Sequence, residues 1–330
     1  MENRSEIGHH RLQEGDAQAR QELVQLAEAG DAGAQFKLGV CYDHGWGMEQ
    51  NYTEAAKWYR LAAEQGHIEA RFNLGDCYKD GLGVEQDYTK AAEWFRLAAE
   101  QGLPDAQYNL GVCYANEVGV ELDYKEAVKW YRKAAGQGYA DAQYNLGICY
   151  KNGRGVRQSY RQAAKWYRLA AEQGDADAQF RLGLCYMNGE GVKSDAAEAC
   201  EWFRLAAEQG YIEAQCNLGN CYYFGFGIHP DDAEAVKWYR LAAEQGDADA
   251  QYNLGLCYKH GRGVKPNDKD AAEWYRLAAE QGHVEAQYNL GWCYEFGEGI
   301  EQNRAKAVEW YLHAAEQGFQ EAETRLTELR

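Results

Sequence analysis

The sequence is poor in several features that would narrow its function at once. It has only 3 Pro among 330 residues, and no run approaches the roughly 18 apolar residues that a membrane-spanning helix needs. It holds 34 Lys and Arg against 52 Asp and Glu, and this formal charge of -18 disfavours a protein that tracks the phosphates of DNA or RNA. The first thirty residues lack the apolar core of a secretory signal. We therefore expect no nucleic-acid partner, no membrane insertion and a cytoplasmic location.

Signatures of catalysis and metal binding are missing as well. The 8 His residues are not at ligand spacing, and neither Cys-x-x-Cys nor His-Glu-x-x-His occurs. A P-loop and the serine elbow of hydrolases are also absent. We therefore predict that the protein is not an enzyme and needs no metal and no cofactor.

What the sequence has instead is a strict internal repeat. A period of 36 residues runs without insertion or deletion from Asp31 to Gly318. Residues 1–30 are predicted to be a polar leader with a capping helix, and residues 319–330 a C-terminal capping helix, because a stacked array requires atypical ends. The eight copies are 31–66, 67–102, 103–138, 139–174, 175–210, 211–246, 247–282 and 283–318.

Each copy predicts two helices joined by a glycine turn. Counting from zero at the start of a copy, positions 3, 7 and 11 hold Ala, Leu and Tyr, which share one helical face. Glycines follow at positions 14 and 16, and position 20 holds Asn, Asp or Ser, which cap helix N-termini. Apolar residues at positions 24, 27, 28, 31 and 32 form a stripe wide enough to contact two neighbouring helices. The fold class predicted is all-α, a stack of helix-turn-helix repeats.

These residues resemble the Sel-like repeat (SLR) family, relatives of the tetratricopeptide repeats. The matching pattern is Ala-x-x-x-Leu-Gly-x-x-Tyr-x-x-Gly-x-Gly-Val, then Ala-x-x-Trp-Tyr-x-x-Ala-Ala-x-x-Gly, and it covers residues 31–318. The resemblance implies a right-handed α/α superhelix whose first helices line the concave side. It also implies an adaptor role, since relatives serve in complex assembly, endoplasmic-reticulum quality control and bacterial encounters with host cells. Glu117 replaces the first turn glycine of the third copy, and we expect that loop to differ locally.

One cysteine precedes the Tyr of every first helix and forms a ladder. Neighbouring members should lie ~8 to 10 Å apart, which is too far for a disulfide. A further pair, Cys200 and Cys216, is about one helical turn out of register, and a bridge between them is not favoured. We expect buried, reduced thiols. The ladder is Cys41, Cys77, Cys113, Cys149, Cys185, Cys221, Cys257 and Cys293.

Position 6 of the first helix holds Asn in six copies. It lies opposite the Ala-Leu-Tyr face and should line the concave groove. A row of amides could hold the backbone of an extended peptide, or each Asn could bond to a neighbouring repeat, and we weigh the two equally. The row consists of Asn73, Asn109, Asn145, Asn217, Asn253 and Asn289.

Recognition should reside where the copies differ, and positions 9, 12, 13 and 15 differ most. Large aromatic residues at solvated positions serve no purpose in folding, so a cluster of them in copies six to eight predicts a binding hot spot. The alternative is contact with the capping helix or with a second copy. The candidate residues are Asn220, Tyr223, Phe224, Phe226, Lys259, His260, Arg262, Trp292 and Phe296.

The sequence thus predicts a protein–protein interaction scaffold that holds a peptide segment or a protein partner in the concave groove. Two alternatives stay open. One is a hydrolase-like or ligand-binding activity, as suggested for cysteine-rich SLR relatives, although those carry two bridged Cys in each repeat and this chain carries one. The other is a consensus-like array without a specific partner. A homo-oligomer is also left open.

Overall fold

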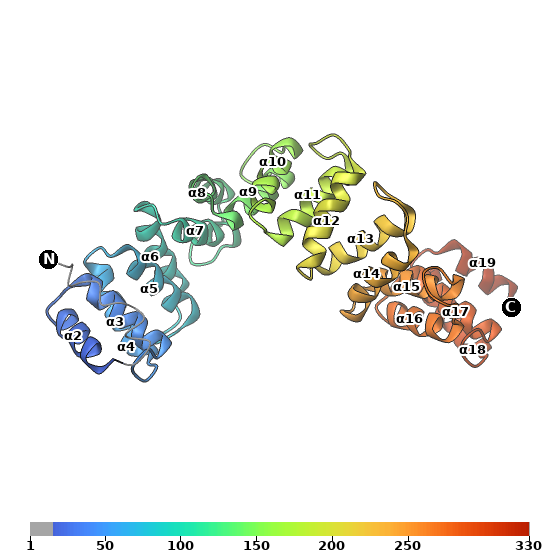
Figure 1. Cartoon of the computed structure of the whole chain (residues 1–330), viewed down its shortest axis with the longest axis horizontal. Helices are drawn as coiled ribbons and strands as arrows, with labels where there is room; N and C mark the ends of the chain where they lie inside the picture. Colours follow the sequence, from blue (N-terminus) through green and yellow to red (C-terminus); the bar gives the residue numbers. More distant parts are fainter. Residues whose placement is uncertain (1–15, 330) are drawn as a thin grey trace. The chain divides into compact units, whose positions relative to one another are not determined.

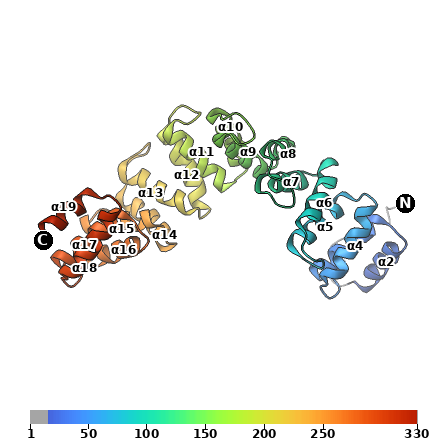
Figure 2. The ribbon, with the colours of Figure 1, turned by 180° about the vertical axis from the view of Figure 1, so that it is seen from behind.

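The computed structural model describes residues 16–329, and within that range all regular structure is α-helical. The helices follow one another in pairs along the chain, as Figure 1 and the opposite view in Figure 2 show. The prediction of an all-α repeat fold is confirmed. The polar leader before Asp16 lies outside the described residues, and the helix predicted to cap the N-terminal end is α2 (Ala17–Glu28).

The chain divides into two compact units, Met1–Trp166 and Tyr167–Arg330, and the division falls inside α10 (Tyr160–Ala171). Consecutive helices pack against each other within each unit. After α2, the first unit contains α3 (Ala32–His44), α4 (Tyr52–Glu64), α5 (Ile68–Asp80), α6 (Tyr88–Glu100), α7 (Pro104–Asn116), α8 (Tyr124–Gly136) and α9 (Ala140–Asn152). The second unit contains α11 (Ala176–Asn188), α12 (Ala196–Glu208), α13 (Ile212–Phe224), α14 (Asp232–Glu244), α15 (Ala248–His260), α16 (Asp268–Glu280), α17 (Val284–Phe296), α18 (Arg304–Glu316) and α19 (Gln320–Glu328).

Glycine is required at the two turn positions for different structural reasons. Gly81 ends α5 in the left-handed conformation, with φ 71°, and its N–H donates to the carbonyl of Cys77. Gly83 is required by close approach, because a Cβ there would lie 2.0 Å from the carbonyl oxygen of Tyr52 in the preceding repeat. The turn can therefore pack against the N-terminus of the previous second helix only if this residue has no side chain.

Glu117 takes the place of the first turn glycine without changing the turn. It adopts φ 58° and ψ 37°, and its N–H donates to the carbonyl of Cys113 as the glycines do in other repeats. The expectation of a locally different loop is therefore wrong. A non-glycine residue in this conformation costs of order 1 kcal/mol, so the helix packing imposes the left-handed backbone on Glu117.

The residue at position 20 caps every second helix, as predicted. Asn51 accepts a hydrogen bond from the N–H of Glu54 at 3.1 Å, and Ser159 accepts one from Gln162 at 3.3 Å. The other six copies make equivalent contacts. The N–H of Asn51 also donates to the carbonyl of Tyr42 at 2.8 Å, so the cap ties the second helix to the first.

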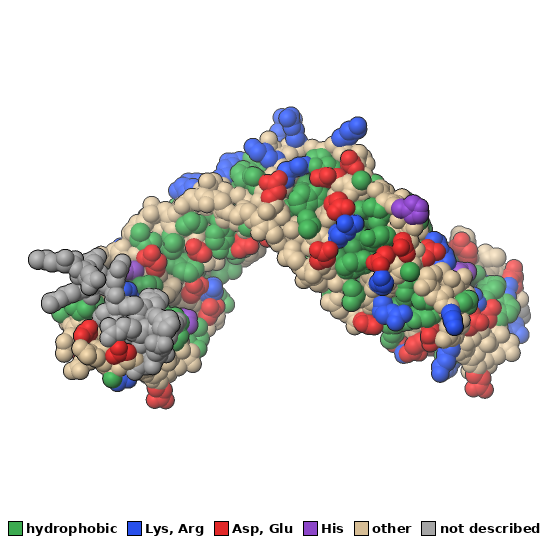
Figure 3. Space-filling model, viewed as in Figure 1, with side chains coloured by type: hydrophobic (Ala, Val, Ile, Leu, Met, Phe, Trp, Pro, Cys, Tyr) green, Lys and Arg blue, Asp and Glu red, His purple; other side chains and the backbone are tan. Residues whose placement is uncertain are grey.

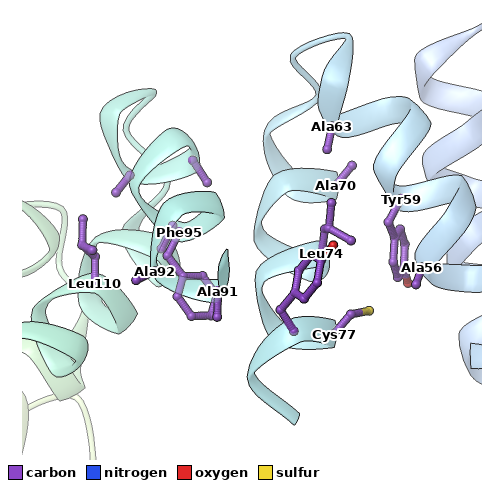
Figure 4. Close-up of a cluster of buried hydrophobic side chains, with 14 of the residues drawn as sticks. Ala56, Tyr59, Ala63, Ala70, Leu74, Cys77, Ala91, Ala92, Phe95 and Leu110 are labelled. Atoms are coloured by element: carbon purple, nitrogen blue, oxygen red, sulfur yellow. The ribbon is translucent and has the colours of Figure 1, made fainter. Parts of the chain in front are cut away.

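The core combines small alanines with one large ring per repeat. Tyr59 of α4 is fully buried and packs on Gly39, where a Cβ would lie 2.6 Å from the ring. Figure 4 shows Ala56 beside Tyr59, and Ala91 and Ala92 beside the equivalent ring in α6. The small residues allow the backbones to approach closely, and the ring fills the remaining volume.

A ladder of buried glutamines joins the repeats, and the sequence analysis missed it. The side-chain amide of Gln35 donates to the carbonyl of Ala27 in the preceding helix at 3.1 Å. The side-chain oxygen of Gln35 accepts from Gln65 at 2.7 Å. Position 4 holds Gln in seven copies, on a helix face that is otherwise apolar, and this was the available signal. The equivalent buried residues are Gln107, Gln143, Gln179, Gln215, Gln251 and Gln287.

Candidate binding surfaces

The six Asn residues of position 6 are all half-buried. Several bond to the preceding repeat: for example, Asn145 donates to the hydroxyl of Tyr108 at 3.4 Å, and Asn253 donates to the side-chain oxygen of Asn220 at 3.3 Å. Asn217 instead donates to the carbonyl of Glu213 in its own helix at 2.8 Å. Hydrogen bonding between repeats thus accounts for Asn145, Asn253 and other members of the row, and peptide binding by the row stays a prediction.

An exposed aromatic cluster lies at the end of α13 and in the turn that follows. The exposed fractions of Phe224 and Phe226 are 57% and 47%, and their ring centroids are 5.3 Å apart. Tyr223 meets Phe224 edge to face at 4.8 Å. We name Tyr223, Phe224 and Phe226 the α13 aromatic cluster.

Arg262 fixes one edge of this cluster. Its guanidinium lies 3.5 Å from the centroid of the Tyr223 ring and donates to the carbonyl of Tyr223. It also forms a bidentate pair with Asp232, at 2.6 and 3.1 Å. Asn220 is occupied in a similar way, since it accepts from the hydroxyl of Tyr239 at 2.7 Å. Arg262 and Asn220, both predicted to bind a partner, therefore have partners within the fold.

Trp292 and Phe296 form a second group, with ring centroids 4.4 Å apart. Arg325 of the C-terminal helix α19 lies over both rings, 5.4 and 5.3 Å from their centroids. It is held there by Glu295, whose carboxylate it contacts at 2.6 Å. Contact with the capping helix, the alternative considered from the sequence, therefore occurs for both rings, although Phe296 remains 46% exposed.

A pocket of about 280 Å³ lies between α15 and α17, and it brings together Lys259, Asn289 and Trp292. His260 lies at its exposed edge. Lys259 forms ion pairs with Glu298 and with Asp268. The charged groups at this pocket thus largely neutralise each other, and its walls are aromatic.

An equivalent pocket of about 360 Å³ lies between α7 and α9 in the first unit, and the sequence analysis did not identify it. Its floor repeats that of the α15–α17 pocket position for position, with two Tyr, one Asn and one Cys. Its edge differs, because Arg154 is the only charged residue that lines it among residues 16–329. The floors consist of Tyr108, Tyr131, Asn145 and Cys149 in one pocket and of Tyr252, Tyr275, Asn289 and Cys293 in the other.

The cysteines depart from the sequence analysis. Cys200 and Cys221 form a disulfide, with their Cα atoms 6.4 Å apart, so the expectation that every thiol is reduced is wrong. Ladder neighbours indeed do not pair with each other. Cys221 instead meets a cysteine on α12, the second helix of the preceding repeat, which packs close enough to α13 to allow a bridge. Cys216, the partner considered for Cys200, is free and buried.

The remaining ladder cysteines are buried. Burial raises the pKa of Cys113 and of Cys149 to about 11, so the thiolate is scarce at neutral pH. The disulfide, by contrast, is typical of an oxidising compartment and weighs against the predicted cytoplasmic location.

Two further features bear on metal binding and on membrane insertion. Between residues 16 and 329, no three His, Cys, Asp or Glu side chains come together in a way that could hold a metal ion. In the same range, no helix combines the length and the apolar character needed to cross a membrane.

Comparison with known proteins gives a consistent result. The family model for the Sel1 repeat matches eight consecutive segments, which begin one residue later than the copies defined above. The comparison with curated proteins found no match. The matched segments are 32–67, 68–103, 104–139, 140–175, 176–211, 212–247, 248–283 and 284–319.

Two solved structures are similar over nearly the whole chain. One is a protective antigen present in uropathogenic Escherichia coli strains that displays an SLR fold: it shares 41% identity over 93% of this chain, with a TM-score of 0.89. This chain spans 66% of that protein's length. The other is a Sel1 repeat protein from Oxalobacter formigenes, with 33% identity over 100% of this chain and 95% of the other, and a TM-score of 0.71.

Proposed function

The chain belongs to the Sel1 repeat family, and on this premise we propose that it is a non-catalytic scaffold that binds another protein. The proposed binding face is formed by the first helices of the second unit, α13, α15 and α17, and by the turns that follow them. A peptide segment or a folded partner would contact the residues that vary between repeats.

The observation that carries the proposal is the exposure of the α13 aromatic cluster. Phe224 and Phe226 keep about half of their surface in water, so they add little to the core. The equivalent residues of the second repeat are Asp80 and Leu82, which shows that the fold does not need aromatic rings here. Arg262 holds Tyr223, which contacts the ring of Phe224, and clustered exposed aromatic residues of this kind are typical of binding hot spots.

Affinity capture with the purified protein tests this role. We would compare wild type with the double variant Phe224→Ala/Phe226→Ala and quantify the captured proteins by mass spectrometry. Recovery of a specific partner should fall about tenfold or more, because hot-spot residues typically contribute more than about 1.4 kcal/mol to binding. The circular dichroism spectrum should be unchanged, because both rings are exposed.

The matched control is Leu82→Ala, which removes an exposed apolar side chain at the same position as Phe226 in the second repeat. It should leave the recovery unchanged. Equal recovery of the partner by wild type and by the double variant would contradict the proposed site. Failure of the wild type to capture any protein would favour the array without a partner.

A further inference from the structure

The fourth repeat has a charge opposite to that of the rest of the chain. Residues 139–174 contain six Lys and Arg against two Asp and Glu, a net charge of +4 within a chain of -18. Each of the other seven repeats is net negative. In Figure 3 the blue Lys and Arg side chains gather over the stretch where Figure 1 places α8, α9 and α10. A local excess of positive charge in an acidic protein is a feature that folding does not require.

Four of these side chains have no acidic partner among residues 16–329. Lys151 lies at the end of α9, Arg154 and Arg157 lie in the turn that follows, and Arg161 lies in the first turn of α10. The three Arg residues are exposed and Lys151 is half-buried. We name these four residues the α9 basic surface.

Arg154 and its counterpart in the seventh repeat differ in how they are paired. Arg262 occupies the same position as Arg154, and there Asp232 neutralises the guanidinium. In the repeat that precedes Arg154, the position of Asp232 is occupied by Tyr124. The guanidinium of Arg154 lies 5.5 Å from the centroid of the Tyr124 ring. The ring orients the planar guanidinium without neutralising it, which leaves its donors available for a carboxylate.

The pocket between α7 and α9 lies beside this guanidinium. Val112, Ala115 and Ile148 form its apolar walls, and none of the acidic side chains that the structure describes lines it. Its volume of about 360 Å³ is large enough for an amino-acid side chain. A ligand that combines an apolar group with a negative charge would therefore fit both features of the site.

We propose that the α9 basic surface binds an acidic peptide segment of a protein partner. A carboxylate of that segment pairs with Arg154, an apolar neighbour enters the pocket, and further acidic residues pair with Arg157 and Arg161. This inference rests on the proposed scaffold function and names the chemistry of a partner. A peptide fits better than a nucleic acid, because the net charge of -18 repels a long polyanion and the pocket takes one side chain.

The test uses the full-length protein and a fluorescent peptide of alternating Glu and Val. The protein is added to the peptide at concentrations up to about 1 mM, and binding is followed by the fluorescence anisotropy of the peptide. The same peptide with Gln in place of Glu is the ligand control. Arg154→Gln should weaken binding of the Glu peptide about tenfold, because it removes a charge-assisted hydrogen bond beside the pocket. Arg157→Gln should weaken binding about threefold, because it removes an ion pair that is exposed to solvent.

Lys265→Gln is the matched protein control. It removes one positive charge at the position of Arg157 in the seventh repeat, where the side chain is also exposed. It should leave affinity within about twofold of wild type, because it lies outside the α9 basic surface. A far-ultraviolet circular dichroism spectrum identical to wild type would show that each variant is folded.

Several outcomes would overturn the inference. They are absence of binding up to about 1 mM, equal affinity for the Glu and Gln peptides, and an Arg154→Gln variant that binds as wild type does. Tighter binding of a single-stranded RNA or an anionic vesicle, lost in Arg154→Gln, would assign the surface to another class of partner. If the peptide fails while affinity capture still depends on Phe224 and Phe226, only this inference falls and the scaffold function stands.

Discussion

The pocket between α7 and α9 and the pocket between α15 and α17 have the same residues in their floors. They differ at the edge, where the basic residue of the first pocket is unpaired among the described residues and that of the second is paired with acidic residues. In the first unit Arg154 lies over Tyr124, and no acidic residue of the described chain pairs with it. In the second unit Lys259 pairs with Glu298 and Asp268 beside the pocket, and Arg262 in the neighbouring turn pairs with Asp232. The two pockets thus share the residues that form their floors and differ in the residues at their edges. The edge residues therefore determine which ligand each pocket can accept.

The difference follows from which residues carry folding free energy. Tyr131 and Tyr275 are 3% and 2% exposed, and each packs on a glycine where a Cβ would clash with the ring. Loss or enlargement of the ring there creates a cavity or an overlap. Edge residues are partly solvated, so a change from Asp to Tyr at the position of Asp232 and Tyr124 costs little stability and alters the local field.

The largest expected effect concerns the shared floor. Tyr131→Ala and Tyr275→Ala should each lower the free energy of unfolding by ~3 to 5 kcal/mol, because each removes a buried ring. Urea denaturation followed by circular dichroism measures this. Tyr131→Phe is the control and should be nearly neutral, since Phe95 and Phe203 occupy the same position in other repeats. A cost for one alanine variant far below that for the other would show that the two floors are not equivalent.

An exchange at the pocket edge should have an intermediate effect. Tyr124→Asp places a carboxylate beside Arg154, as Asp232 lies beside Arg262, and should weaken binding of the acidic Glu peptide about tenfold by occupying the guanidinium. Asp232→Asn should lower the free energy of unfolding by about 1 kcal/mol, because it leaves Arg262 without its ion pair. Isothermal titration and thermal melting measure the two changes. If Tyr124→Asp binds the peptide as tightly as wild type does, then the ion pairing of the arginine does not account for the difference between the two pocket edges.

The smallest expected effect concerns the backbone at the end of α7. Glu117→Gly should raise the free energy of unfolding by ~0.5 to 1 kcal/mol, because glycine accepts φ 58° without strain. Gly153→Glu, at the same position in the next repeat, should lower it by a similar amount, since Gly153 has φ 70°. Melting temperatures of the two variants provide the test. If both variants melt at the wild-type temperature, the α7 turn stores no strain that distinguishes it from the turns of the second unit.

Much of the fold could be predicted because its signals are local. Turn glycines, the N-caps at position 20 and the spacing of Ala, Leu and Tyr each act within a few residues, so one repeat suffices to recognise them. The candidate site was predicted less completely. Phe224 and Phe226 are exposed as their variability suggested, but Arg262, Trp292 and Phe296 contact parts of the fold that lie about 30 residues away in the sequence.

The sequence by itself determined the period, the helices, their caps and the fourth repeat's excess of positive charge, because these depend on residue type and on short-range hydrogen bonds. Only the tertiary structure decided which of those charges are paired, which cysteines meet and which rings are covered. Asp232 and Arg262 are 30 residues apart and Cys200 and Cys221 are 21 apart. Such pairs meet only after one helical repeat has packed on the next, at distances that depend on the size of the residues between them.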